Sequence, residues 1–158
     1  MVTLQPMTEA ESQHFLEPAI LEYARGHVEG GHWTEAEAVE KSRKELQDLL
    51  PQGVRTPNHY VFTLVNEAQQ QVGMLWFARQ ESQGHPMAFV YEVRIDEAFR
   101  RQGGASQAFR EMENTVRALG WNRISLHVFG KNYAALDMYK KLGYEMTNVL
   151  MARTLEQQ

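Results

Sequence analysis

The 158-residue sequence contains no cysteine, so the chain has no disulfide, no thiolate metal ligand and no cysteine nucleophile. Such a chain is compatible with a reducing compartment, and we expect a cytoplasmic location. No apolar run is long enough to cross a bilayer, and the residues after Met1 lack a signal-peptide pattern, so we expect no membrane partner. Basic residues are not in excess either: the formal net charge of −4 argues against a broad nucleic-acid-binding surface.

The sequence also lacks internal repeats, low-complexity tracts and linkers. A chain of 158 residues suits one domain, and we expect a single domain over residues 1–158. Hydrophobic residues make up 43% of the chain, which is enough to build a core.

The first third of the chain reads as a short strand followed by two helices. Residues 2–6 are the strand candidate, and capping-box patterns that begin at Thr8 and Thr34 each predict the start of a helix. Pro18 lies inside the first helical stretch, so we expect a kink there or a late helix start. Glycines interrupt residues 27–33 and predict a break between the two helices.

Three strand candidates follow, over residues 59–65, 72–79 and 88–95. The polar turns between them are short, which favours antiparallel hairpins. From Ala105 onward the apolar residues recur at three- and four-residue steps, which is typical of a helix face.

The last part of the chain predicts a further strand and helix. Residues 123–129 form a strand candidate that follows a helix, so it should run parallel to its predecessor through a right-handed crossover. Asn132 caps a short helix that Gly143 ends. We expect residues 144–146 and 149–155 to close the sheet as strands.

The junction between strand 88–95 and the helix at Ala105 holds two arginines and two glycines, Arg100, Arg101, Gly103 and Gly104. The first turn of a helix carries backbone N–H groups without partners and the positive end of the dipole. Glycine lets a phosphate approach those groups without a side chain in the way. The alternative is an ordinary strand-to-helix turn with solvated arginines, and the residues alone leave both interpretations open.

The amino-acid pattern of this junction is more informative than its general chemistry. Arg100-x-x-Gly103-x-Ala105, placed after a strand and before a helix, resembles the Arg/Gln-x-x-Gly-x-Gly/Ala signature of the GNAT N-acetyltransferases.

A second motif lies at the separation expected in the same family. Asn132-x-x-Ala135-x-x-x-Tyr139-x-x-x-Gly143-Tyr144 resembles the pattern Asn-x-x-Ala-x-x-x-Tyr-x-x-x-Gly-Phe/Tyr. The surrounding residues resemble a small bacterial branch of GNAT proteins.

The resemblance implies the α/β (α+β) GNAT fold, with a mixed, mostly antiparallel sheet and helices on both faces. The parallel pair, strands 88–95 and 123–129, would splay where Ile95 and Phe129 end, and the gap would seat the pantetheine arm of acetyl-CoA. The pyrophosphate would lie on the N–H groups of the loop. The residues implied to bind this co-substrate are Val93, Ile95, Arg100, Arg101, Gln102, Gly103, Gly104, Ala105, Ser106, Asn132, Ala135 and Tyr139.

Acetyl transfer to an amine sets clear chemical demands. A lysine-like amine has a pKa of about 10.4 in water and must lose a proton before it attacks. The leaving thiolate needs a proton donor, and in the family the tyrosine at position 139 faces the sulfur, so Tyr139 is our candidate general acid. The alternative is that Tyr139 is a core residue of an amphipathic helix. The resemblance assigns the oxyanion donor to a backbone N–H near Val93, Arg94 or Ile95.

Two residues are candidates for the general base. His127 lies on strand 123–129, and a histidine with a pKa of about 6.5 can relay a proton from a bound amine. Glu92 sits in an otherwise apolar strand, where a buried carboxylate needs a reason. The alternatives are a satisfied core histidine at 127 and an ion pair of Glu92 with Arg94, two residues along the strand.

Polar and aromatic residues gather around the break between the first two helices, which forms one wall of the acceptor pocket in GNAT proteins. His27 and His32 suggest a metal, but their spacing is not a same-face spacing on a helix, so we expect no metal site. Two interpretations of this segment remain: a flexible wall of the acceptor pocket, or a solvated loop without a function. The candidates for the wall are His27, Glu29, His32, Trp33 and Glu35. Trp33, Tyr60 and Trp76 are candidates for the lining of the pocket, and the alternative is that these three aromatic residues belong to the core.

The resemblance therefore implies an enzyme that moves an acetyl group from acetyl-CoA to a primary amine of a small molecule, a peptide N-terminus or a protein lysine. A second interpretation is a catalytically idle acyl-CoA-binding module that senses or regulates. A third, an α/β domain unrelated to CoA, would require both motifs to arise by chance. A homodimer that uses the terminal strands is also compatible with the sequence.

Overall fold

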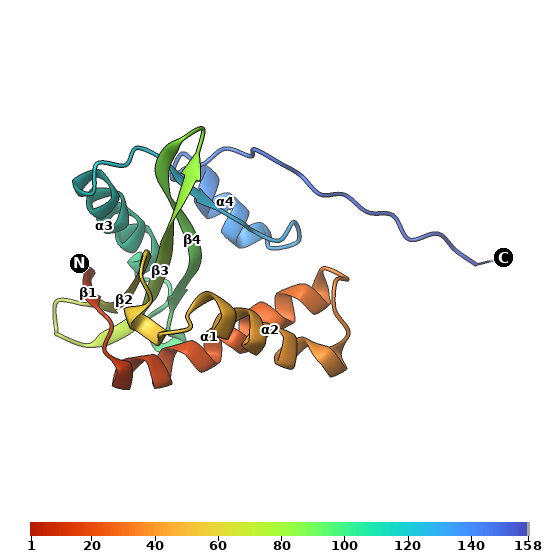
Figure 1. Cartoon of the computed structure of the whole chain (residues 1–158), viewed down its shortest axis with the longest axis horizontal. Coiled ribbons are helices and arrows are strands. Elements are labelled where there is room, and N and C mark those ends of the chain that lie inside the picture. Colours follow the sequence, from red (N-terminus) through yellow and green to blue (C-terminus); the bar gives the residue numbers. More distant parts are fainter. Residues whose placement is uncertain (158) are drawn as a thin grey trace.

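The computed structural model describes residues 1–157 and shows one sheet between two helical layers (Figure 1). Within these residues the sheet has five strands in the order β1-β2-β3-β4-β5. The strands are β1 (Thr3–Pro6), β2 (His59–Val65), β3 (Gln71–Ser82), β4 (His85–Ile95) and β5 (Ile124–Leu126). The helices are α1 (Glu9–Glu29), α2 (Glu35–Leu49), α3 (Gly104–Ala118) and α4 (Tyr133–Lys141), with short 3-10 turns η1 (Gly53–Arg55) and η2 (Glu97–Phe99).

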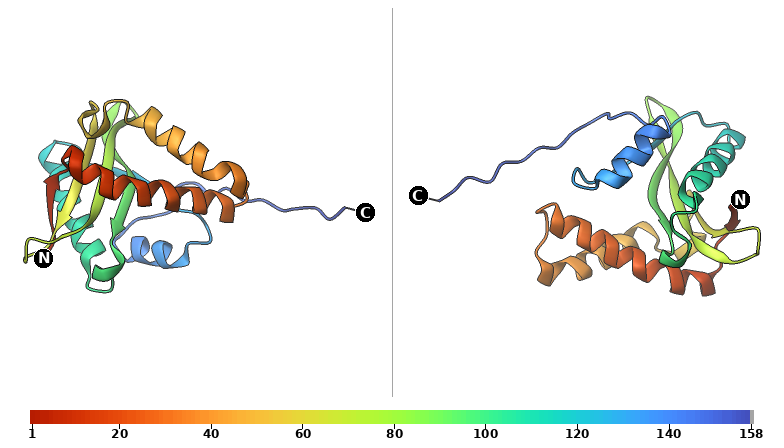
Figure 2. Two further views of the ribbon diagram at one scale, coloured as in Figure 1. Left: turned by 90° about the horizontal axis from the view of Figure 1, so that it is seen from below. Right: turned by 180° about the vertical axis from the view of Figure 1, so that it is seen from behind.

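The two faces of the sheet carry separate hydrophobic clusters. One cluster packs the sheet against α3, where Ala108, Phe109 and Met112 are fully buried, and α4 adds half-buried residues to it. The other packs the sheet against α1 and α2 through Phe15, Ala19 and their neighbours. The two views of Figure 2 show α1 and α2 on one side of the sheet, and α3 and α4 on the other. The predicted α/β fold with helices on both faces is therefore confirmed.

The pairing of the strands also matches the prediction. β1 to β4 pair antiparallel, and β4 pairs parallel with β5. The β3–β4 hairpin is longer than predicted because the turn residues Gln83 and Gly84 adopt φ of 52° and 80°, a left-handed pair that suits a tight hairpin. β5 is shorter than predicted and ends at Leu126 instead of residue 129.

A β-bulge in β4 decides which side chains face which layer. Trp76 pairs with Glu92 and Phe77 pairs with Val90, so Tyr91 is the extra residue. A bulge shifts the alternation of side chains by one position. As a result Val90 and Val93 both face the α3 layer, while Arg94 faces α1, where it meets Glu22.

The capping signals locate both N-terminal helices. At Thr8 the capping box forms in full: the Glu11 N–H donates to Thr8 Oγ1 at 3.1 Å, and the Thr8 N–H donates to Glu11 Oε1 at 2.9 Å. Thr34 also precedes its helix, but its hydroxyl donates to the Glu37 carboxylate at 2.9 Å. Among the residues that the structure describes, the second box lacks the bond from the backbone to Thr34.

Helix α1 is longer than the sequence suggests. It begins at Glu9 and continues through Pro18 to Glu29, so a late start at Pro18 is wrong, and the break expected over residues 27–33 is confined to its second half. Pro18 costs the helix a hydrogen bond, and the burial of Phe15, Ala19 and Ile20 on both sides of it offsets that loss. None of the helices within residues 1–157 is long and apolar enough to cross a membrane.

The predicted closing strands are wrong. Residues 144–146 and 149–155 form no strand in the described part of the chain, and after α4 the chain leaves the body as an extended segment (Figure 1). A strand forms only where a neighbour pairs with it, and this segment runs away from the sheet of its own chain.

Candidate active site

A cleft of about 360 Å³ opens at the C-terminal end of β4. Many of the residues that the sequence motif singled out line it: Val93, Ile95, Arg100, Arg101, Gly103, Gly104, Ala105 and Ser106. The remaining lining residues are Arg94, whose backbone N–H is one of the candidate oxyanion donors, and Glu22, Phe99 and Met138, which the sequence did not point to as ligand contacts. The cleft thus joins the end of a strand, a loop and the first turn of α3 with one residue from α1 and one from α4.

The loop before α3 is shaped by two left-handed residues. Gly103 is the N-cap of α3 with φ of 78°, and Arg101 has φ of 65°, which is uncommon for a residue with a side chain. A Cβ added at Gly103 would meet no described atom nearer than Gln107 Nε2 at 3.8 Å, so glycine leaves open space above the turn.

The first turn of α3 keeps its hydrogen-bond donors available. Within residues 1–157, no side chain caps this turn, and no acidic residue occupies it. Its N–H groups and the positive end of the helix dipole therefore point into a cleft that Arg100 and Arg101 also line. This is the physical arrangement of a site for a phosphate or another anion.

A network of charges borders the cleft. Nε of Arg100 donates to the Ile95 carbonyl at 2.8 Å, which fixes the loop against the end of β4. The Glu22 carboxylate lies 3.5 Å from Nε of Arg94 and 3.7 Å from Nη2 of Arg100. Arg94 is the more buried of the two, and its Nε and Nη1 have no hydrogen-bond partner in the described chain. Glu22 escaped the sequence analysis because a charged residue of an amphipathic helix looks like a solvated one.

The parallel strands part earlier than predicted. Their pairing covers three positions and ends where Val90 meets Leu126, not at Ile95 and Phe129. Beyond Val90, β4 continues to Ile95 and pairs there with β3. The bulge at Tyr91 increases the local twist, which contributes to the early separation. The side of β4 that faced β5 is therefore open next to Val93 and Ile95.

Glu92 is half-buried beside this opening, and its removal from solvent is the main influence on its pKa. Loss of contact with solvent and, to a smaller extent, the negative charge of Glu22 raise the pKa of Glu92 to about 8, against the opposing effects of Arg94 and the Val93 N–H. The alternative of a simple Glu92–Arg94 ion pair is wrong, because Arg94 forms its ion pair with Glu22. A carboxyl group with this pKa is mostly protonated at pH 7, and the form that can accept a proton predominates only above about pH 8.

Tyr139 lies on α4 next to Met138, which lines the cleft. Its ring packs edge-on against Phe109 at 5.4 Å and Tyr144 at 6.0 Å, so the expected core contacts are present. Burial raises the pKa of the Tyr139 phenol, and the charge of Glu92 adds to the effect. The phenol therefore keeps its proton at neutral pH and is within electrostatic reach of Glu92.

His127 is exposed, so the alternative of a satisfied core histidine is wrong. It follows β5 and packs edge-on against Phe129 at 5.0 Å. Phe129 in turn covers Gly26 of α1, where a Cβ would lie 2.5 Å from the ring. This contact brings the segment after β5 onto the end of α1.

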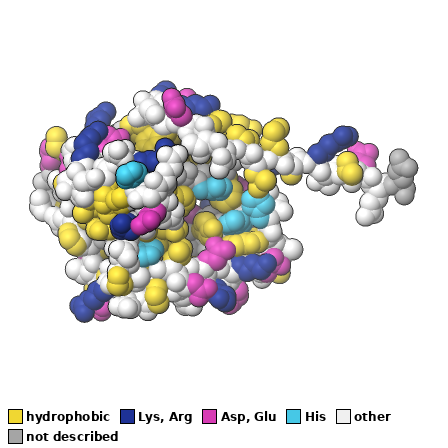
Figure 3. Space-filling view, turned by 45° about the horizontal axis from the view of Figure 1, so that its top comes forward, with side chains coloured by type: hydrophobic (Ala, Val, Ile, Leu, Met, Phe, Trp, Pro, Cys, Tyr) yellow, Lys and Arg dark blue, Asp and Glu magenta, His cyan; other side chains and the backbone are white. Residues whose placement is uncertain are grey.

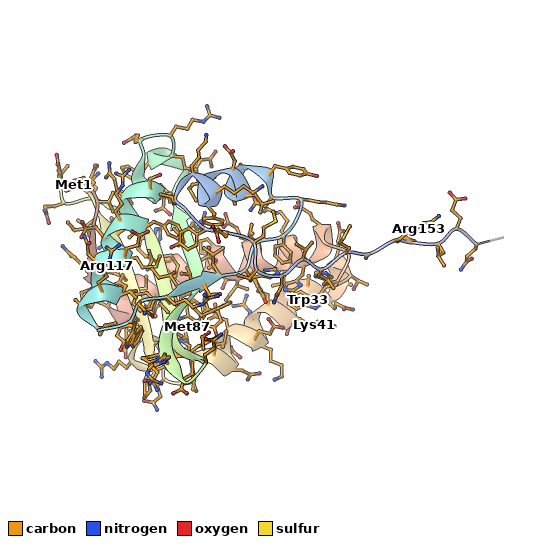
Figure 4. All side chains as sticks on the ribbon, turned by 90° about the horizontal axis from the view of Figure 1, so that it is seen from above. Met1, Trp33, Lys41, Met87, Arg117 and Arg153 are labelled. Carbon is orange, nitrogen blue, oxygen red and sulfur yellow. The ribbon has the colours of Figure 1, made fainter. Side chains whose placement is uncertain are left out.

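The histidines predicted for an acceptor wall do come together there. His27 stacks on Trp33 at 3.9 Å, and its Nδ1 lies 3.2 Å from Nδ1 of His32. The two rings also contact Phe129, at 5.1 and 6.1 Å. Figure 3 shows histidine side chains gathered around a hollow beside exposed hydrophobic side chains. Figure 4 shows Trp33 close to Lys41, whose Nζ is 5.9 Å from the centre of the indole.

The surroundings of His27 favour its uncharged form. Burial lowers the pKa of His27; the Glu45 carboxylate opposes this effect, and the nearby imidazoles of His32 and His127 reinforce it. Burial also raises the pKa of the adjacent Tyr23 to about 12. In residues 1–157, no group of three or more His, Asp or Glu side chains is arranged to hold a metal ion.

Other predicted residues lie outside the cleft. Asn132 Oδ1 accepts from the Ala135 N–H at 3.2 Å, so these two residues define the start of α4, and Gln102 is exposed on the loop. Trp76 is buried in the core, and Tyr60 stacks on Phe77 at 4.9 Å, so both are core residues and not pocket residues. Glu29 and Glu35 are exposed.

Comparisons with known proteins agree with this geometry. The sequence model described as the Acetyltransferase (GNAT) family matches residues 20–144. The chain is 36% identical over 153 residues to a Bacillus subtilis protein described as the uncharacterized N-acetyltransferase YdgE, covering 97% of this chain and 98% of that protein.

A second Bacillus subtilis protein, described as the uncharacterized N-acetyltransferase YycN, is 32% identical over 154 residues, with 98% of this chain and 99% of that protein covered. Its crystal structure, titled a putative acetyltransferase, aligns with a TM-score of 0.94 and 31% identity over 99% of this chain and 100% of that chain. That alignment includes the extended segment after α4.

Proposed function

The chain belongs to the acetyltransferase (GNAT) family and is an acyltransferase, and on this premise we propose that it moves an acetyl group from acetyl-CoA directly to a primary amine. The observation that carries the proposal is the single cleft that unites the end of β4, the Arg100–Gly103 loop and the first turn of α3. Residues from a sequence motif and residues of a physical anion site coincide there.

The residues of the cleft fit the parts of acetyl-CoA. The N–H groups of Gly103, Gly104, Ala105 and Ser106 would hold the pyrophosphate, assisted by the arginines of the loop. The open side of β4 at Val93 and Ile95 would pair with the amide groups of the pantetheine arm, as an added strand does. Acetyl-CoA supplies the thioester as the second substrate, and we propose no metal.

Three groups of this chain would serve the transfer. The acceptor nitrogen bonds to the carbonyl carbon while the carbon–sulfur bond breaks, and the nitrogen loses a proton. A backbone N–H near Val93, Arg94 or Ile95 would donate to the carbonyl oxygen as negative charge develops. The Tyr139 phenol would give its proton to the leaving thiolate, a role supported by its raised pKa, which favours the protonated phenol.

The proton lost by the amine needs a base, and Glu92 and His127 remain the candidates. Glu92 is favoured by its burial close to the opened strands and by a pKa of about 8, since a carboxylate with that pKa is a far stronger base than a solvated one. His127 is favoured by exposure beside the aromatic wall, where a water chain can reach it.

The acceptor would enter between this wall and the cleft. His27, His32, Trp33 and Phe129 form an aromatic wall with rings in mutual contact. Such a surface suits an acceptor with an apolar or aromatic portion next to its amine, from a small molecule, a peptide N-terminus or a protein lysine. We further propose one domain over residues 1–158, a cytoplasmic location supported by the cysteine-free sequence, no nucleic-acid or membrane partner, and a homodimer.

Release of thiol from acetyl-CoA in the presence of a panel of primary amines tests the proposal. We expect release that depends on at least one amine and that increases with pH as the amine and the base lose their protons. Tight CoA binding without release for any amine would instead support a catalytically idle acyl-CoA-binding module. Absence of both binding and release would leave only the fold.

A further inference from the structure

One carboxylate oxygen of α1 faces two arginines from different parts of the site. Oε1 of Glu22 lies 3.5 Å from Nε of Arg94 on β4 and 3.7 Å from Nη2 of Arg100 in the loop before α3. Both distances are longer than those of typical hydrogen bonds, so the oxygen is shared between the two guanidinium groups. Glu22 therefore connects the strand that carries Glu92 to the loop that would hold the diphosphate.

The surroundings of Arg94 limit how its charge can be balanced. Its side chain is 16% exposed, and its Nε and Nη1 have no hydrogen-bond partner among the described residues. A guanidinium is always charged in a protein, and a charge with little access to water needs a counter-charge nearby. Glu22 supplies one from α1. Glu92, two residues away on the same face of β4, is in position to supply another.

The two carboxyl groups therefore compete for one cation. The groups that act on Glu92 from its surroundings are Glu22 of α1, Arg94 of β4 and the Tyr139 phenol of α4. Arg94 is the one cation among these groups. While Glu22 neutralises Arg94, loss of contact with solvent favours the protonated form of Glu92. Without the charge of Glu22, the guanidinium would be left unbalanced unless Glu92 gave up its proton.

The contact with Arg100 places the same carboxylate beside the anion site. Arg100 is anchored through Nε, which donates to the Ile95 carbonyl at 2.8 Å, so its two terminal nitrogens are left for other partners. Glu22 balances part of that charge at Nη2. A diphosphate at the first turn of α3 would compete with Glu22 for these nitrogens, and the two negative charges would repel each other. Glu22 consequently opposes diphosphate binding while it balances Arg94.

We propose that Glu22 is a positioning residue of the acetyl transfer inferred above, on which this inference rests: it neutralises Arg94 in place of Glu92, and it opposes diphosphate binding by Arg100. When the diphosphate binds Arg100, Glu22 is released from that contact and pairs with Arg94 alone. Occupation of the loop thus strengthens the pair that keeps Glu92 without a counter-ion. A carboxylate without a counter-ion accepts a proton more strongly than one paired with an arginine, so CoA binding would prepare the base.

The variant Glu22→Gln keeps the size of the side chain and removes its charge. We expect the carboxyl resonance of Glu92, followed by NMR of ¹³C-labelled protein, to titrate at least about one pH unit lower than in the wild type. We also expect CoA to bind about two- to fivefold more tightly in a calorimetric titration, because a like charge beside the diphosphate is gone. Glu17→Gln is the matched control, since Glu17 of α1 also pairs with an arginine, Arg43 of α2 at 2.7 Å, and lies outside the cleft. It should leave both values unchanged.

The double variant Glu22→Gln/Arg94→Met removes both charges, and it decides the case if Glu22→Gln alone does not fold. In it, Glu92 should titrate within about half a pH unit of the wild type, because neither the competitor nor the cation remains. Circular dichroism should confirm that each variant measured is folded.

An unchanged titration of Glu92 in Glu22→Gln, or an equal decrease in the double variant, would overturn the role of Glu22 toward Arg94. A CoA affinity that is unchanged or weaker in Glu22→Gln would overturn its role at the loop. The NMR titration needs neither CoA nor an amine. A protein that shows the expected change at Glu92 but releases no thiol would therefore contradict the proposed acetyl transfer and not the pairing of Glu22 with Arg94.

Discussion

The carboxylate of Glu22 on α1 lies 3.5 Å from Nε of Arg94 on β4, and this ion pair leaves the neighbouring Glu92 without one. Arg94 and Glu92 are only two residues apart, yet the arginine forms its ion pair with α1. Glu92 is left half-buried without an ion-pair partner, and its pKa is raised to about 8. Two predictions about pH depend on this arrangement.

The first concerns stability. The pKa of Glu92 is about 8 in the folded chain against 4.5 in its ordinary state, so its contribution to stability is fully present below about pH 4.5 and is lost as the pH rises through 8. Glu92→Gln cannot ionise and should remove this loss. Thermal unfolding between pH 5 and 9 should give similar free energies of unfolding for wild type and variant at low pH. At pH 9 the variant should be the more stable of the two, by on the order of 3 kcal/mol. If the free energies of unfolding of the two proteins change in parallel with pH, the pKa of Glu92 is not raised in the folded chain.

The second concerns catalysis. If Glu92 is the base, kcat/KM of the wild type should rise with an apparent pKa near 8, because the carboxylate forms only in that range. Glu92→Gln should lose this limb and about 10²-fold in rate at pH 8.5. His127→Gln is the matched comparison, since it removes the other candidate. Loss of the limb in His127→Gln alone would assign the base to the histidine.

A third prediction concerns the proton donor. Tyr139→Phe removes one oxygen and keeps the ring that packs against Phe109, so the fold should be unaffected. We expect kcat to fall well over tenfold with the dissociation constant of acetyl-CoA nearly unchanged, because the phenol would act on the leaving thiolate and not on binding. Tyr144→Phe is the control, since Tyr144 packs on the same Phe109. An unchanged kcat in Tyr139→Phe would discard the acid role.

A fourth prediction isolates the loop before α3. Gly103→Ala places a side chain at φ of 78° above the N–H groups that would hold the pyrophosphate. Gly120→Ala is a close match, because Gly120 has φ of 83° and lies past the other end of α3. Both should cost roughly 1 kcal/mol of stability through left-handed strain. Only Gly103→Ala should weaken CoA binding, by about tenfold or more in a calorimetric titration. Equal affinities of the two variants for CoA would show that the loop at Gly103 does not bind the co-substrate.

Local signals explain which parts of this molecule could be predicted. The capping box at Thr8, the Asn132 cap and the short turns between strands each act over a few residues, and the corresponding elements begin close to where the sequence places them. The anion site is also local, since the glycines and arginines of one loop build most of it. The elements from β1 to α4 therefore follow the predicted order, and eight of the residues that the family resemblance implies for co-substrate binding line the cleft.

The remaining features arise from contacts between distant segments. No local sequence pattern predicts the bulge at Tyr91. The bulge turns Arg94 toward α1, where Arg94 meets Glu22 at the border of the cleft. The stacking of Phe129 on Gly26 joins residues far apart in sequence, and it places His127 at an exposed wall instead of in the core. Residues 149–155 have the composition of a strand, but they pair with no strand in residues 1–157, because composition alone does not bring a segment to a sheet edge.

A crystal structure of the protein grown with CoA would show whether the cleft at the end of β4 binds the co-substrate. We expect the diphosphate oxygens to lie within hydrogen-bond distance of the N–H groups of Gly103 to Ser106. The pantetheine arm should lie beside Val93 and Ile95, and the sulfur should lie next to the hydroxyl of Tyr139. Density for CoA elsewhere on the surface, with the Arg100–Gly103 loop free, or a sulfur beyond the reach of Tyr139, would contradict it.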